Sequence, residues 1–140
     1  MDYSGSTILV LGAGLSGIGV AHTLAKLGAN VTLNDYKLIE FDVSESKKFE
    51  EDHIRVITGQ QDFILLEGVD RVVVSPGISL EIPIISEAKK RHIPVVGEVE
   101  IAYEVSKAPI LGVTGTNGKT TTTSLLAAVL KEAQWDVYVG

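Results

Sequence analysis

Two glycine-rich segments contain the residues whose types and spacing could hold phosphate groups. The first is Gly12-Ala13-Gly14-Leu15-Ser16-Gly17, which lies between an apolar run and a stretch with helical spacing of apolar residues. In such a segment Gly12 permits a tight turn, Gly14 lets the backbone approach a ligand, and Gly17 lets a helix pack on a strand. The start of the helix then offers free N–H groups and a partial positive charge to an anion.

An acidic residue follows the second apolar run of the chain. Asp35 stands about where a carboxylate would accept hydrogen bonds from ribose hydroxyls. The position of the first glycine segment between a strand and a helix favours ligand binding. The alternative is that its glycines only serve a tight turn between these elements.

The second segment runs from Gly112 to Thr121 and contains the core Gly118-Lys119-Thr120 of a phosphate-binding loop. In such loops the backbone N–H groups surround the phosphates, and the Lys ammonium group reaches the β and γ phosphates. The hydroxyl of Thr120 can ligate Mg²⁺. A strand-like run before the segment and a helix-like run after it agree with this interpretation.

The second segment departs from the general pattern at one place. The pattern requires glycine five positions before Gly118, where Val113 stands, with Gly112 and Gly115 on either side. The departure weakens the assignment to a general nucleoside triphosphatase but not to nucleotide binding. A coincidental turn rich in Gly and Thr is the alternative.

The elements that must position these segments alternate along the chain. Strands are predicted at residues 7–11, 31–33, 54–57, 71–74 and 94–96, and helices at 16–27, 44–52, 83–92 and 98–105. Short, continuously apolar runs are typical of strands buried on both faces. Their alternation with helices predicts a Rossmann-like α/β domain with a mostly parallel sheet.

The pattern breaks at residues 106–109, and a new unit follows, with strands predicted at 110–113 and 136–139 and a helix at 120–132. Each phosphate loop belongs at the start of its own parallel sheet. We therefore predict one domain at residues 1–105 and the truncated start of a P-loop ATPase domain at 106–140. About twenty residues follow Lys119, too few for a core, so we expect this chain to be a fragment of a longer enzyme.

Composition excludes several classes of partner and site. Eighteen acidic and twelve basic residues give a formal net charge of −6, and there is no cysteine. An acidic surface disfavours nucleic acid and membrane as partners. The lack of cysteine excludes disulfides, thiolate zinc sites and cysteine nucleophiles. Without a signal peptide or a sufficiently long apolar stretch, a soluble cytoplasmic protein is expected.

The octet Thr114-Gly115-Thr116-Asn117-Gly118-Lys119-Thr120-Thr121 resembles the ATP loop of the Mur ligase family, in which Val113 is normal. Upstream, the segments Leu11 to Gly17, Ser75-Pro76-Gly77-Ile78 and Gly97-Glu98-Val99-Glu100, together with Asp35, resemble in order and spacing the branch of this family that adds D-glutamate. The resemblance covers essentially the whole chain. It implies a UDP-binding N-terminal domain followed by the opening of a central ATPase domain.

The resemblance also implies roles for particular residues. The helix start would meet the diphosphate, Asp35 and its neighbours would hold the uridine, and Gly77 would line the same pocket. Lys37 stands where the family often has Arg, so it keeps the charge but loses the planar fork. The implied UDP-binding residues are Gly14, Leu15, Ser16, Asp35, Tyr36, Lys37 and Gly77, and the implied ATP-binding residues are Gly115, Thr116, Asn117, Gly118, Lys119, Thr120 and Thr121.

The implied reaction forms an amide bond. ATP phosphorylates the carboxylate of UDP-N-acetylmuramoyl-L-alanine, and the amine of D-glutamate attacks the acyl phosphate. Lys119, the implied catalytic residue, and Mg²⁺ on Thr120 would neutralise charge on the moving phosphoryl group.

The family's remaining metal ligands and its D-glutamate site lie beyond Gly140. We therefore expect the chain alone to bind UDP but to be inactive and to bind ATP weakly. We also expect it to self-associate through residues 110–140, whereas the full-length enzyme would be a monomer.

Three other functions remain open. An NAD-dependent oxidoreductase module would explain Asp35 and the first glycine segment but not the second. A non-catalytic nucleotide sensor would explain the small size of the second unit. A sibling ligase would differ in the amino acid that it adds.

Overall fold

A computed structural model describes residues 2–139 of the chain. The chain divides into two compact units, Met1–Val105 and Ser106–Gly140. Each unit is described by itself.

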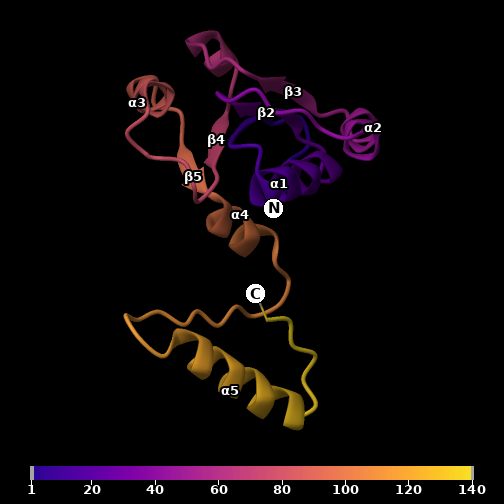
Figure 1. Cartoon of the computed structure of the whole chain (residues 1–140), viewed down its shortest axis with the longest axis vertical. Helices are drawn as coiled ribbons and strands as arrows, with labels where there is room; N and C mark the ends of the chain where they lie inside the picture. The colour runs from indigo at the N-terminus through magenta and orange to yellow at the C-terminus, as the bar shows by residue number, and fades with distance from the viewer. Residues whose placement is uncertain (1, 140) are drawn as a thin grey trace. The chain divides into compact units, whose positions relative to one another are not determined.

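The first unit is built on a parallel sheet (Figure 1). Among the described residues, five strands pair in the order β3-β2-β1-β4-β5, and every pair is parallel. The strands are β1 (Thr7–Leu11), β2 (Asn30–Asp35), β3 (Arg55–Thr58), β4 (Arg71–Val74) and β5 (Val95–Gly97). The predicted α/β class with a parallel sheet is confirmed.

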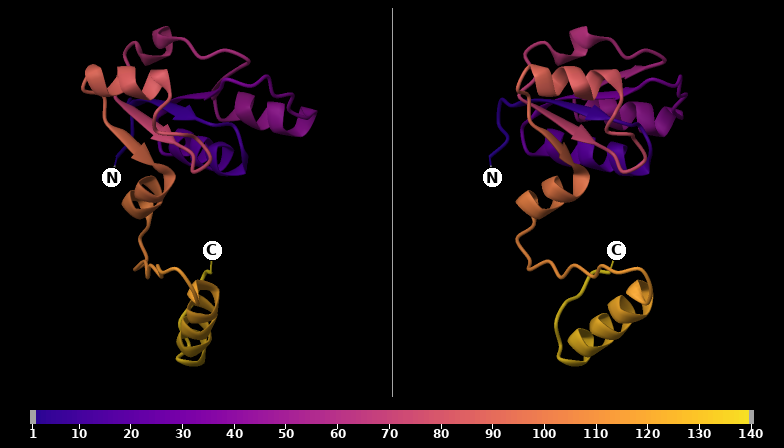
Figure 2. Two further views of the ribbon diagram at one scale, coloured as in Figure 1. Left: turned by 60° about the vertical axis from the view of Figure 1, so that its left-hand side comes forward. Right: turned by 90° about the vertical axis from the view of Figure 1, so that its left-hand side faces the viewer.

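Helices cover both faces of this sheet (Figure 2). They are α1 (Leu15–Lys26), α2 (Val43–Glu51), α3 (Pro83–Lys90) and α4 (Glu98–Val105), with a 3-10 helix η1 (Phe63–Leu66). One apolar cluster contains buried side chains of α1, α2 and α4, and the other contains those of α3 and η1. The sheet is therefore the middle layer of three.

The central strand shows why the sheet is buried on both faces. Ile8 and Val10 enter the cluster with α1, whereas Leu9 and Leu11 enter the cluster with α3. All four are almost fully buried. Burial of each such side chain contributes about 1.5–3 kcal/mol, so the strand that leads into the first glycine segment is firmly held.

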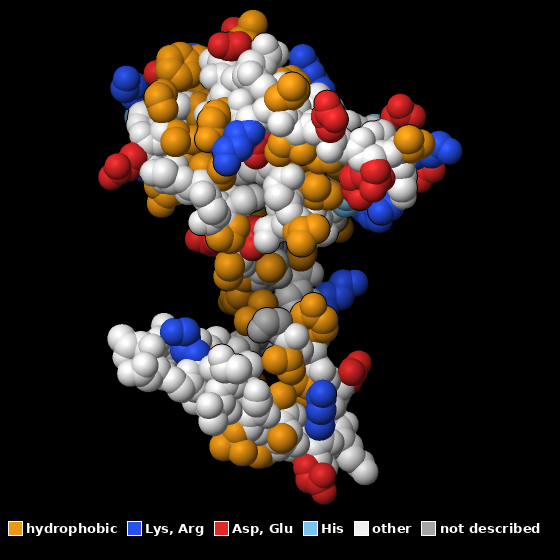
Figure 3. All heavy atoms as spheres, in the orientation of Figure 1, with side chains coloured by type: hydrophobic (Ala, Val, Ile, Leu, Met, Phe, Trp, Pro, Cys, Tyr) orange, Lys and Arg blue, Asp and Glu red, His pale blue; other side chains and the backbone are white. Residues whose placement is uncertain are grey.

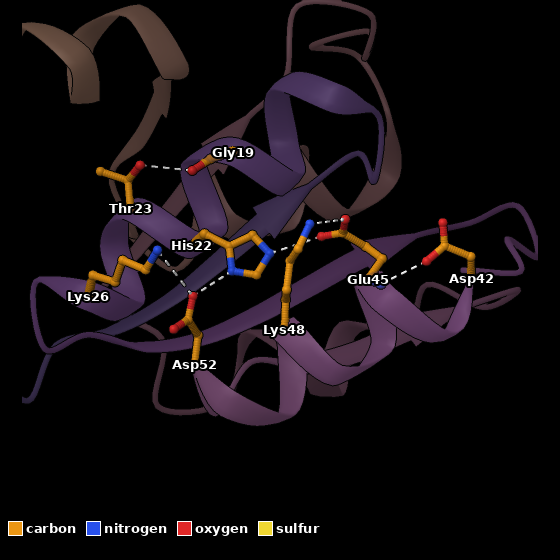
Figure 4. A network of polar contacts seen from close by, with 8 residues as sticks. All are labelled: Gly19, His22, Thr23, Lys26, Asp42, Glu45, Lys48 and Asp52. Atoms are coloured by element: carbon orange, nitrogen blue, oxygen red, sulfur yellow. Dashed lines mark hydrogen bonds and ion pairs between the residues drawn. The ribbon is translucent and has the colours of Figure 1, made fainter.

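A network of polar contacts joins α1 to α2 (Figure 4). The two ring nitrogens of His22 lie 2.6 Å from Asp52 Oδ2 and 3.1 Å from Glu45 Oε1. The ring also stacks on Phe49, with 5.3 Å between the centroids. The hydrogen bond with His22 holds the pKa of the Glu45 carboxyl below its ordinary value. His22 is thus a packing residue at the junction of two helices.

A second polar cluster fixes the end of α4. The Tyr3 hydroxyl donates to Glu104 Oε2 at 2.5 Å, and Arg71 Nη1 donates to the same oxygen at 2.7 Å. Tyr3 is buried, with 4% of its surface exposed. Burial, followed by the hydrogen bond to the Glu104 carboxylate, raises the pKa of Tyr3 to about 12.

This raised pKa predicts a loss of stability at high pH. Tyrosine in the unfolded chain titrates near pH 10, so the contribution of Tyr3 is fully present below that pH and is lost as pH rises from about 10 to about 12. Urea unfolding of the unmodified chain and of Tyr3→Phe across this interval tests the effect. The difference in unfolding free energy between them should shrink as pH rises. A constant difference would contradict the assigned pKa.

The second unit contains α5 (Lys119–Glu132). The strands predicted at 110–113 and 136–139 are wrong, because both segments lack regular secondary structure. A strand needs a neighbour to accept and donate its backbone hydrogen bonds. Within the described part of this unit there is no other strand to pair with them. The apolar sequence pattern alone therefore does not form a strand here.

Several large apolar side chains of the second unit are exposed, as the orange atoms of this unit in Figure 3 illustrate. They include Leu125 and Val129 of α5, and Trp135 and Tyr138 after it. The predicted self-association through residues 110–140 stays a prediction. Across residues 2–139, no helix combines the length and the apolar character that crossing a membrane requires.

Candidate nucleotide-binding site

The candidate site lies where the carboxyl ends of β1, β2 and β4 meet. The order of the strands makes β1 the point at which the chain changes direction across the sheet. In open parallel sheets, ligands bind in the crevice outside the carboxyl ends of the strands at this point. The first glycine segment begins directly after β1, so the fold places it at this edge.

Hydrogen bonds tie the turn after β1 to both neighbouring strands. The Gly12 N–H donates to the carbonyl of Asn34 at 2.8 Å, and the Ser75 N–H donates to that of Leu11 at 3.0 Å. Gly12 has a φ of +100°, and a Cβ at this position would come within 3.0 Å of the Ser75 Cβ. The turn therefore requires glycine both for its backbone conformation and for its close approach to Ser75, the residue directly after β4.

The start of α1 presents backbone donors at the same edge. Gly14 is the residue before the helix and has no side chain to cap it. The first N–H groups of a helix have no acceptor within the helix and, with the helix dipole, favour an anion. Leu15 is 95% exposed and Ser16 is also exposed. No atom lies within 4 Å of a Cβ built on Gly14, so the space beside this backbone is open.

Asp35 connects the first glycine segment to the turn after β2. It is 8% exposed. Its Oδ2 accepts from the Ala13 N–H at 3.0 Å and its Oδ1 accepts from the Lys37 N–H at 2.9 Å. The carboxylate thus fixes two backbone segments at the edge where a ligand would lie. Each oxygen also has a second lone pair that could accept from a hydroxyl.

The structure brings the predicted UDP-binding residues of the first unit to one edge of the sheet. Tyr36 and Lys37 are exposed in the turn after β2, with the Lys37 Nζ 5.7 Å from the centre of the Tyr36 ring. Gly77 is exposed in a turn after β4, which is closed by a hydrogen bond from the Ile78 N–H to the Ser75 carbonyl. Their contacts with a ligand remain predictions.

The second glycine segment lies in the other unit and is exposed. Gly118 precedes α5 with a φ of +75°, and Lys119 is the first residue of that helix. The Lys119 Nζ donates to the carbonyl of Gly115 at 2.6 Å. The ammonium group therefore lies against the backbone of its own loop. Thr120 follows in the first turn of α5 with an exposed side chain.

Sequence analysis missed Asn34 and Ala13 as parts of this arrangement. Asn34 is fully buried in β2 and uses its carboxamide to hold the turn after β3. A polar residue directly before Asp35, at the end of an apolar run, was the available signal. The backbone bond from Ala13 to Asp35 has no signal in the sequence. Within residues 2–139, no three His, Cys, Asp or Glu side chains gather to hold a metal ion.

The parallel sheet and the glycine turn at its carboxyl edge define a class of protein. This class is the doubly wound α/β domain with a glycine turn after β1, where the strand order reverses. Comparison with protein families narrows the class. A model described as the N-terminal domain of MurD-like Mur ligases matches residues 6–97, and one described as the Mur ligase middle domain matches residues 113–140. The chain therefore belongs to the Mur ligase family, and its first unit is a MurD-like N-terminal domain.

Similar curated proteins carry the name UDP-N-acetylmuramoylalanine–D-glutamate ligase. The protein of Ligilactobacillus salivarius is 44% identical over 132 residues, which cover 94% of this chain and 29% of that protein. The protein of Caldanaerobacter subterraneus is 42% identical over 141 residues, which cover 100% and 31%. The chain thus spans less than a third of the length of these relatives.

Solved structures of Mur-type ligases share the fold. A murein peptide ligase from Psychrobacter arcticus superposes with a TM-score of 0.64 and 25% identity, covering 93% of this chain and 27% of that one. UDP-N-acetylmuramate-alanine ligase from Thermotoga maritima gives a TM-score of 0.57 and 23% identity, covering 92% and 30%.

Proposed function

We propose that this chain is the N-terminal part of a cytoplasmic, ATP-dependent ligase that adds D-glutamate to UDP-N-acetylmuramoyl-L-alanine in peptidoglycan precursor synthesis. Residues 1–105 would bind the UDP group of the substrate, and residues 106–140 would open the ATPase domain. The observation that supports this proposal best is the 42–48% identity to proteins with the matching name across both units of the chain. By itself the chain would bind the UDP group without catalysing the reaction.

The geometry of the first site suits a nucleoside diphosphate. The backbone donors at the start of α1 would bind the diphosphate, and Gly14 leaves the space that it needs. Gly77 would line the same pocket from the turn after β4. Tyr36 and Lys37, together with the Asp35 carboxylate at the end of β2, would hold the uridine. The charge of Lys37 would complement the anionic ligand in a chain of net negative charge.

The second segment would take part in the transfer of a phosphoryl group. Residues 115–121 would surround the triphosphate of ATP, and Lys119 would exchange its contact with Gly115 for the β and γ phosphates. Thr120 would offer its hydroxyl to Mg²⁺, an ion that usually binds one or two protein groups together with waters and phosphates. When bound, Mg²⁺ neutralises charge on the phosphoryl oxygens.

Calorimetric titration of the chain with UDP-N-acetylmuramoyl-L-alanine, NADH and ATP tests the proposal. We expect binding of the UDP compound, no binding of NADH and weak binding of ATP, because the ATP loop is exposed and Leu125 and Val129 of the helix after it are exposed as well. The UDP compound should also raise the unfolding temperature, since a ligand that binds only the folded state stabilises it. Binding of NADH alone would overturn the proposal and favour an oxidoreductase module.

A further inference from the structure

A buried carboxamide lies directly behind the proposed nucleoside-binding segment. Asn34 is 0% exposed at the end of β2. Its Nδ2 donates to the carbonyls of Ile57 at 2.9 Å and Gln60 at 2.8 Å. Its Oδ1 accepts from Gln61 Nε2 at 2.9 Å. These three hydrogen bonds all go to the end of β3 and the turn that follows it, which we call the β3 turn (residues 57–61).

The β3 turn is also hydrogen-bonded to the segment that follows β2. The N–H of Gly59 lies 3.1 Å from the carbonyl oxygen of Asp35 and 3.0 Å from that of Lys37. Leu38 lies beside Gly59, where an added Cβ would meet its side chain at 3.4 Å. The β3 turn therefore contacts the backbone on both sides of Tyr36, an exposed residue of the proposed nucleoside site.

Burial of apolar surface cannot hold the β3 turn in place. Gly59 and Gln60 are exposed, and Gln61 is only partly buried. Its position is set by hydrogen bonds: the pairing of its first two residues with β2, the two bonds of the Gly59 N–H, and the three bonds of the buried Asn34 carboxamide, which reach the turn from inside the sheet. A buried amide contributes little net stability compared with an apolar side chain of similar size, but its bonds are directional. The buried amide of Asn34 is therefore suited to fixing the position of the β3 turn, more than to adding stability.

We propose that Asn34 is a positioning residue for nucleoside recognition: through the β3 turn it holds residues 35–37 in the conformation that receives the uridine of the substrate. This inference rests on the proposed function of the first site. It assigns a share of the affinity for the nucleoside to Asn34, a fully buried residue outside the proposed ligand contacts. Binding of the diphosphate, which would lie at the start of α1, should not depend on Asn34 in the same way.

The expected effect follows from preorganisation. If the segment adopts its binding conformation only part of the time, the apparent dissociation constant rises by the inverse of that fraction. In Asn34→Leu the two donors and the acceptor are lost, while the branching of the side chain at Cγ is kept. We expect the variant to bind UDP about tenfold more weakly, as for a segment that is ordered about a tenth of the time. Its affinity for pyrophosphate should be unchanged.

The test compares Asn34→Leu with Ile84→Val, which removes a methylene group from the buried apolar cluster around α3. Both are measured by calorimetry with UDP and by NMR titration with pyrophosphate, well below the unfolding temperature of each variant. The Lys119→Ala background removes any contribution of the second loop. Ile84→Val should lose stability while keeping its affinity for UDP. Equal UDP affinity for Asn34→Leu and the unmodified chain, or an equal loss for pyrophosphate, would overturn the inference.

Two further measurements keep the result decisive. Gln61→Leu removes one of the three hydrogen bonds at a partly exposed position, so it tests the inference even if Asn34→Leu does not fold; we expect about threefold weaker UDP binding, a fraction of the larger effect. Amide hydrogen exchange at Gly59 should accelerate in Asn34→Leu. If the unmodified chain does not bind UDP, the proposed function fails. If it binds UDP but the variants bind equally well, the inference alone fails.

Discussion

Replacement of Gly17 by Ala is expected to unfold the first unit or to lower its stability by about 3 kcal/mol or more. A Cβ at this position would lie 1.8 Å from the carbonyl oxygen of Gly12 and 2.7 Å from Ser75 Oγ. The first atom belongs to the backbone, so no change of side-chain rotamer can remove the clash. The Gly12 backbone cannot retreat either, because its N–H is bonded to Asn34 in the neighbouring strand.

Gly19 offers a matched control two residues further along the same helix. No atom lies within 4 Å of a Cβ built there, and the residue is exposed. Gly19→Ala should therefore raise stability by about 1 kcal/mol, the difference in helix propensity between the two residues. Thermal unfolding followed by circular dichroism measures both variants. A shift of the same sign and size in the two would show that helix propensity, not contact with the β1 turn, governs this segment.

The glycine spacing carried more information than any single element prediction. It indicated a tight turn at Gly12 and close helix packing at Gly17, and the structure has a positive φ at the first and a backbone contact at the second. The partner in these contacts, Ser75, lies 63 positions from Gly12. That pairing depends on the crossing of the chain from β3 to β4, which local pattern does not specify.

The same dependence on distant partners explains the wrong strand prediction in the second unit. Residues 7–11 and 110–113 are both short apolar runs before a glycine loop, and the pattern predicts a strand for each. The first run has two parallel neighbours, whereas the second has none within the described part of its unit. The 3-10 helix at 63–66 was not predicted, because a four-residue apolar stretch is too short to show a helical period.

The polar networks could not be predicted for a related reason. His22 lies between two carboxylates only because α2 packs beside α1. Tyr3 meets Glu104 across almost the whole length of the first unit. Residue types at these positions are common on protein surfaces, so nothing in the local sequence distinguishes them. For Asn34, the presence of a polar residue at the end of an apolar run was a signal, but nothing in the sequence indicated its hydrogen-bond partners.

Asp35→Ala is expected to weaken the binding of UDP at least thirtyfold, or by about 2 kcal/mol. The carboxylate accepts from the N–H groups of Ala13 and Lys37, which belong to the two segments proposed to hold the diphosphate and the uridine. Its removal would leave both donors without their acceptor and the segments without their common anchor. Stability should fall by about 3 kcal/mol, because hydrogen bonds to charged acceptors are strong.

In Asp35→Ala the loss of stability must be distinguished from the loss of UDP binding, and a variant at Asp70 serves as the control. Its Oδ2 accepts from the Thr7 N–H at 2.8 Å, so it is also a carboxylate bonded to the backbone of the sheet. Thr7 begins β1, so this bond lies at the opposite end of the strand from the candidate site. Asp70→Ala should lose some stability and keep its affinity for UDP. Calorimetry on both variants, at a temperature where each is folded, decides the matter. If Asp35→Ala bound UDP as tightly as Asp70→Ala, Asp35 would be a structural carboxylate and the nucleoside site would have to lie elsewhere along the edge of the sheet.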